Sequence, residues 1–241
     1  MKIDSIKISH YNYTNFQGRK IDNLVEKLSM RDFYANPDPC EFIELRKVYN
    51  NLWSKLALPN NLKPRIQYRA MLSEMGFEPE SYTIYVKKSL SPFQMSVRNK
   101  SGRNESTLRH EIEHVKQVWD IIRLLGAEKA AEMFAKSTSS IGFKPSPSML
   151  KKMKEIEKTL GRISPNSDEG KNAQLYIKAI ENYPDTEAYY GILSIKDIKD
   201  FFKYKNNILE KKANIAAKEY EPSILKELKV MLKEFKSLLI S

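Results

Sequence analysis

The spacing of apolar and polar residues along the chain predicts a mainly helical protein. Apolar side chains recur every three or four residues in several segments, which is the spacing of a buried helix face. We expect helices over residues 21–34, 41–58, 149–160 and 172–182, followed by two lysine-rich helices after residue 195. The last of these carries a strict apolar stripe, made of Ile224, Leu228, Met231, Phe235 and Leu238. Such a stripe ordinarily docks onto the core, and a partner helix is the alternative.

Short strands are predicted in the region between residues 65 and 97. Residues 81–86 and 93–97 are rich in β-branched and aromatic side chains and are bounded by proline or polar turns. Residues 3–8 suggest a further strand near the start of the chain. Residues 59–64 are predicted to be a linker, and residues 136–147, rich in Ser, Gly and Pro, a loop. The expected fold class is α+β, predominantly helical, with a small sheet.

A further helix, predicted over residues 108–122, has two different faces. Its buried stripe alternates spacings of four and three, at Leu108, Ile112, Val115, Trp119 and Ile122. His110 and His114 lie roughly opposite that stripe, since each residue turns the helix by about 100°. The helix can therefore bury one side and present both histidines to a cleft on the other.

These two histidines belong to the pentapeptide His110-Glu111-Ile112-Glu113-His114, which matches the pattern HExxH. Side chains four residues apart lie one above the other on a helix, so both imidazoles can bind one zinc ion at about 2.0–2.1 Å. Glu111 would then point at the water on that ion. The pattern predicts His110 and His114 as metal ligands and Glu111 as the general base.

A catalytic zinc needs one more protein ligand. The position six residues after His114 is Asp120, but Gln117 stands where a glycine would have to bend the chain. The helix should therefore continue and place Asp120 about 15 Å along the axis from His110, which is out of reach. Gln117 is expected either to line the same cleft or to be a polar surface residue.

The segment of residues 181–191 supplies better donors. Together with the HExxH helix, its acidic residues before Ala188 resemble the minimal gluzincins, small bacterial and phage metallopeptidases whose third zinc ligand is an acidic residue on a second helix. In that group a glutamate commonly stands three residues before an alanine. That position holds Asp185 here, whereas the glutamate of the segment is Glu187. We favour Glu187 because of its longer reach and keep Asp185 as the alternative.

The resemblance implies a zincin-like core and a zinc-dependent metallopeptidase acting on a peptide or protein. Zinc would lower the pKa of its water to about 7 and polarise the scissile carbonyl, while Glu111 moves the proton to the leaving amine. Tyr189 or Tyr190 could donate a hydroxyl to the oxyanion.

Charge suggests a second interpretation. The 241 residues carry a net charge of +11, which would fit an acidic partner such as nucleic acid. The lysines are interspersed with acidic residues, however, which is typical of a solvated face. The alternative to the peptidase is therefore a basic helical protein, associated with phage or nucleic acid, whose metal site is structural or vestigial.

Three further expectations concern organisation and location. The chain has one cysteine, no apolar leader at its start and no stretch as long as a membrane span. We expect a cytoplasmic protein, packaged in a virion if phage-encoded, without a membrane partner. The expected units are an N-terminal strand and helical extension over residues 1–60, a zincin-like catalytic core over 61–192, and lysine-rich helices over 193–241, together forming one compact body.

Overall fold

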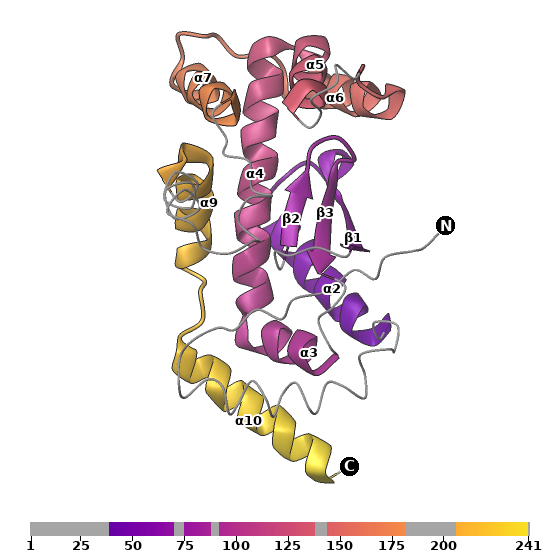
Figure 1. The fold of residues 1–241 in the computed structure, drawn as a ribbon, viewed down its shortest axis with the longest axis vertical. Coiled ribbons are helices and arrows are strands. Elements are labelled where there is room, and N and C mark those ends of the chain that lie inside the picture. Colours follow the sequence, from indigo (N-terminus) through magenta and orange to yellow (C-terminus); the bar gives the residue numbers. More distant parts are fainter. Residues whose placement is uncertain (1–38, 70–74, 88–91, 138–143, 182–205, 241) are drawn as a thin grey trace, which may run out of the picture.

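One long helix, α4 (Arg103–Leu125), forms the centre of the fold (Figure 1). The computed structural model describes residues 39–69, 75–87, 92–137, 144–181 and 206–240. A small sheet lies on one side of α4, and helices α7 (Asp168–Glu181) and α9 (Ile208–Lys218) lie on the other. The described residues are predominantly helical with one small sheet, which confirms the predicted α+β class at that level.

The apolar stripe predicted for α4 is buried. Leu108, Ile112, Val115, Trp119 and Ile122 are all at most 5% exposed. Glycines with positive φ flank the helix: Gly102 (φ 93°) stands before its first residue and Gly126 (φ 88°) after its last. Glycine adopts this left-handed region without the steric cost that a Cβ brings, so both ends of α4 are encoded locally.

The sheet has three strands in the order β1-β3-β2. Strand β1 (Arg65–Arg69) runs parallel to β3 (Thr83–Lys87), and β2 (Met75–Glu78) runs antiparallel to it. Strand β3 matches the strand predicted for residues 81–86. Strand β2 packs against α4, so it is the strand nearest the motif helix. The predicted linker contains a short 3-10 helix, Asn60–Leu62, whose Leu62 is fully buried.

The strand predicted for residues 93–97 is wrong, because this segment lies within helix α3 (Pro92–Ser101). A short apolar run fits a buried helix turn as well as a strand, and packing decides between them. Pro92 opens the helix, where its missing N–H does no harm. Met95 then enters the core and accepts a hydrogen bond at its sulfur from the side chain of Asn104, in α4.

The remaining helices agree with the predicted segments. Helix α2 is Pro39–Lys55, α6 is Pro147–Leu160 and α7 matches the helix expected over 172–182, while α5 (Ala127–Ser137) follows α4 directly. Their buried side chains join those of the sheet and of α9 in one continuous core. Asn207, the N-cap residue of α9, donates a hydrogen bond from its side chain to the carbonyl of Ala179, at the end of α7 (3.1 Å). The strand expected at residues 3–8 and the helix at 21–34 lie outside the described residues.

The last helix, α10 (Ile224–Ile240), packs against α3. Glu234 accepts hydrogen bonds from Lys100 (2.7 Å) and Ser96 (2.9 Å) of α3. Within the described part of the chain, the predicted apolar stripe of α10 is only partly covered: Ile224 is 78% and Leu228 37% exposed. None of the described helices combines the length and apolarity needed to cross a bilayer.

A buried hydroxyl joins three of these elements and can be tested by mutation. Tyr82 donates to the carbonyl of Leu62 and accepts from the indole of Trp119, each at 2.7 Å. In Tyr82→Phe both partners lose their hydrogen bond in a buried site, so we expect the free energy of unfolding in urea to fall by about 1–3 kcal/mol. Tyr85→Phe is the control, because its hydroxyl is only half-buried. Equal losses in the two variants would contradict this account.

Candidate metal centre

Helix α4 brings His110 and His114 together one turn apart. Both are half-buried, and their Nε2 atoms lie 3.0 Å from each other. The two rings are nearly perpendicular, with an interplanar angle of 80° and centroids 4.7 Å apart. Both Nε2 atoms therefore face one point beside the helix, as the HExxH spacing predicts.

A carboxylate from α9 completes the group. Glu210 Oε2 lies 3.4 Å from His110 Nε2, and Glu210 Oε1 lies 3.5 Å from His114 Nε2. The N-cap residue Asn207 accepts a hydrogen bond from the N–H of Leu209 (2.9 Å), so Glu210 falls in the first turn of α9. A negative charge is favoured there by the helix dipole. Glu210 is nevertheless only 3% exposed, which calls for a positive partner.

The spacing of these three donors fits a metal ion. Ligands bound at about 2.0–2.1 Å in a tetrahedron are about 3.3–3.4 Å from one another. The three distances here are 3.0, 3.4 and 3.5 Å. His110, His114 and Glu210 form a group of potential metal ligands within the described residues. Within the described residues the group has two imidazoles and one carboxylate, and three protein ligands of these types are also the number found in catalytic zinc sites.

Glu111, the residue after the first histidine, is buried beside this group. Its Oε2 accepts a hydrogen bond from the backbone N–H of Phe77 in β2 (2.8 Å). Burial raises the pKa of Glu111, the charges of His114 and His110 oppose this, and the net shift is upward. A carboxylate with a raised pKa exchanges protons more readily near neutral pH, as a general base and acid must.

The imidazole of His110 is also perturbed by its neighbours. Burial alone would lower its pKa, but the hydrogen bond with Glu210 and the negative charges of Glu111 and Glu210 outweigh burial, and the pKa is raised. Asn214, one turn after Glu210 on α9, also hydrogen-bonds His110 and favours its charged form. The site thus attracts positive charge, whether a proton or a metal ion.

The other polar residues of α4 have separate roles. Gln117 is buried and bonds to His114, so the cleft-side prediction for it is closer to the structure than the surface one. Glu113 pairs with Lys116 (3.2 Å) and Asp120 with Arg123 (3.5 Å), each on the same helix. Because α4 continues straight through Gln117 to Leu125, Asp120 takes no part in the ligand group, as predicted.

The ligands and oxyanion donors predicted from the sequence lie elsewhere in the chain. Glu187, its alternative Asp185, and the two tyrosines Tyr189 and Tyr190 fall in residues 182–205, outside the described residues, so these assignments stay predictions. Glu210 is the third donor that the described structure supplies, and sequence reasoning missed it.

A signal for Glu210 was nevertheless present. Glu210 stands three residues before Ala213, which is the spacing that the resemblance associates with the third ligand. Two other glutamates after the motif share this spacing, Glu128 and Glu132, but both are exposed residues of α5. The spacing alone therefore leaves three candidates, and burial beside the two histidines selects Glu210.

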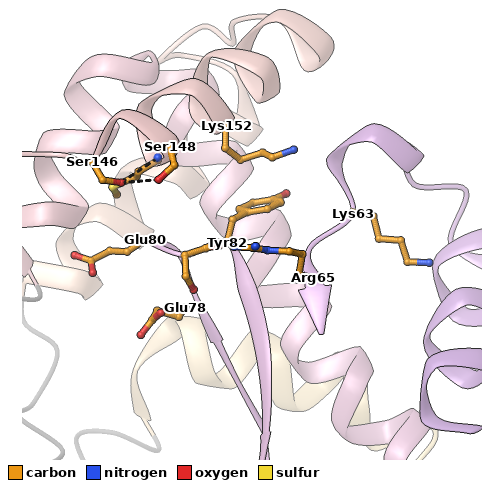
Figure 2. Close-up of a pocket in the computed structure, with 10 residues that line it drawn as sticks. Lys63, Arg65, Glu78, Glu80, Tyr82, Ser146, Ser148 and Lys152 are labelled. Atoms are coloured by element: carbon orange, nitrogen blue, oxygen red, sulfur yellow. Dashed lines mark hydrogen bonds between the residues drawn. The ribbon is translucent and has the colours of Figure 1, made fainter. Parts of the chain in front are cut away.

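A separate hollow of about 590 Å³ lies between the start of β3 and the N-terminus of α6 (Figure 2). Its lining carries both signs of charge, with Arg65 and Lys152 against Glu78 and Glu80. Lys152 is paired with Glu155 (2.7 Å), and Arg65 donates to the carbonyl of Ser81 (3.3 Å). None of the potential metal ligands lines it. This hollow is therefore not part of the metal centre.

No protein-family model, curated protein or solved structure matches the chain. Its function is therefore inferred from the site itself.

Replacement of Glu210 by glutamine removes a charged ligand and keeps the size of the side chain. Loss of an outer-sphere partner alone costs about 10–100-fold in metal affinity, so we expect Glu210→Gln to weaken zinc binding by at least about a hundredfold in a chelator competition assay. The control is Glu113→Gln, which also removes one negative charge. Because Glu113 lies outside the ligand group, this variant should bind zinc normally.

The same assay decides between the two assignments of the third ligand. Glu187→Gln and Asp185→Asn should retain zinc if Glu210 is the ligand. A large loss of affinity in either variant, with normal binding by Glu210→Gln, would overturn the assignment to Glu210.

Proposed function

We propose that the protein is a zinc-dependent metallopeptidase of the gluzincin type, with a zincin-like core. His110, His114 and Glu210 hold the ion, and Glu111 is the general base and acid. The observation that carries this proposal is the convergence of two imidazoles and a buried carboxylate on one point, with the HExxH glutamate buried beside them. A structural zinc site would have no need of that additional carboxylate.

The residues divide the chemistry between them. A zinc ion, when bound, would lower the pKa of a water to about 7 and polarise a carbonyl group. Glu111 accepts the proton of the attacking water and passes it to the departing amine. Phe77 donates its N–H to Glu111 Oε2, which orients the carboxylate for both transfers. For the oxyanion we keep Tyr189 or Tyr190 as the proposed donor.

The backbone of β2 supports a peptide as the substrate. In the described sheet β2 is an edge strand, paired with β3 alone. Phe77 lies opposite Ile84 of β3, but its N–H donates to Glu111. This N–H therefore points away from β3. In an antiparallel pair the C=O of such a residue points the same way. The carbonyl of Phe77 and the backbone of Met75, two residues earlier, can therefore pair with an extended peptide as an added strand.

The decisive variant is Glu111→Gln, which keeps the shape of the side chain and removes its basicity. We expect zinc to be retained while hydrolysis of a quenched fluorescent peptide library falls by about 10²–10⁴-fold, the usual contribution of a general base. Glu113→Gln is the matched control and should cleave at the wild-type rate. Undiminished cleavage by Glu111→Gln, or no cleavage by zinc-loaded wild-type protein, would overturn the proposal.

A second candidate is a basic binding protein with a structural metal, and α10 favours it. Both glutamates of α10 lie beside cations of other helices. Glu227 is 3.9 Å from Arg103 of α4, and Glu234 is 2.7 Å from Lys100 of α3. The exposed charges of α10 are therefore lysines, at positions 226, 229, 233 and 236. This positive row could bind the phosphates of a nucleic acid weakly.

Salt dependence tests this second candidate. Lys229→Glu with Lys233→Glu should weaken binding to duplex DNA and flatten its dependence on salt, because each lost phosphate contact removes about one unit from the slope. The matched control is Lys151→Glu with Lys158→Glu, which changes two exposed lysines of α6. Equal effects of the two pairs would show that only net charge matters and would exclude α10 as a binding surface.

A further inference from the structure

Gln117 links the metal-binding face of α4 to α9. It lies three residues after His114, and only 2% of it is exposed. A buried amide needs partners for its oxygen and its nitrogen. Here Gln117 Oε1 lies 2.9 Å from His114 Nδ1, and Gln117 Nε2 donates to the carbonyl of Leu209 at 3.0 Å.

These two contacts fix the position of a proton. A backbone carbonyl can only accept, so the NH₂ group of Gln117 must face Leu209. The oxygen of the amide must then face His114, and it can only accept as well. His114 therefore carries its proton on Nδ1. In the neutral ring this leaves the lone pair of Nε2 free, and that atom faces His110 and Glu210.

The same amide also acts on the third donor. Leu209 directly precedes Glu210, so the hydrogen bond from Gln117 holds the first turn of α9 against α4. We propose that Gln117 is a positioning residue, which sets the tautomer of His114 and aligns α9 so that His114 and Glu210 meet at one ion. The effect on metal binding rests on the proposed function, whereas the tautomer does not.

Glutamine is the side chain that this position requires. Glutamate could accept from His114 Nδ1, but it could not donate to the Leu209 carbonyl, and it would add a negative charge beside Glu111 and Glu210. Methionine has a similar size but would leave both partners without a hydrogen bond. The two substitutions therefore separate the role in the tautomer from the role in aligning α9.

Nitrogen NMR of the histidine rings tests the proposal on the full chain. At pH 8.5 the metal-free wild-type protein should show His114 as the Nδ1–H tautomer, with its signals assigned through His10→Gln and His110→Gln. In Gln117→Met we expect a mixture of tautomers and about 10–100-fold weaker zinc binding. Gln117→Glu should keep the tautomer and still bind zinc more weakly than wild type.

The control is Gln174→Met. The exposed amide of Gln174 also donates to a backbone carbonyl, that of Pro165 (3.3 Å), but neither residue belongs to the metal centre.

The possible results are distinct. A proton on Nε2 of His114 in the wild-type protein would overturn the proposal, and so would unchanged zinc affinity in Gln117→Met. The tautomer is read in the wild-type protein, so this result depends neither on the folding of a Gln117 variant nor on hydrolysis. The expected tautomer in a protein that cleaves no peptide would leave this proposal standing and overturn only the peptidase.

Discussion

The burial of Glu210 between α4 and α9 is the constraint on which the rest of the site depends. A carboxylate that is 3% exposed costs several kcal/mol unless a positive group compensates it, and a second buried carboxylate, Glu111, lies near it. The two imidazoles are the compensating groups, either by taking protons or by sharing a divalent cation. The packing of α9 across α4 is therefore coupled to the charge held at their interface, so binding a metal ion should also stabilise the fold.

The two sides of helix α4 have different roles: one packs in the core, and the other carries the histidines of the site. Its apolar stripe is covered by the core, so the helix is held rigidly along its length. The histidines project from the other side, where α9 supplies Glu210 and Asn214. Strand β2 reaches the boundary between the two sides, and a single backbone N–H of Phe77 orients Glu111. Helix α4 thus supplies the two histidines and Glu111, β2 supplies the N–H that orients Glu111, and α9 supplies the third donor.

What could be predicted from the sequence follows from the range of each interaction. The helices and the pairing of His110 with His114 depend on residues three or four positions apart, so periodicity was sufficient. The segment at 93–97 is helical and not the predicted strand, because a run of five residues does not distinguish a strand from a helix turn, and packing on α4 decides between them. Glu210 is distant in sequence from His114, and only the folded chain shows that it is buried beside the histidines. The spacing of Gln117 from His114 could indicate a place beside the cleft, but its hydrogen bond to the carbonyl of Leu209 gives no sequence signal, because that acceptor is backbone.

The hydrogen bond from Asn207 to the carbonyl of Ala179 has a consequence for how the chain could tolerate change. It joins the last turn of α7 to the start of α9, so these two ends lie side by side. The position of Glu210 is then set from these two anchored ends. The third donor is therefore sensitive to residues that never touch the ion, because a substitution at Asn207 releases the start of α9 from α7.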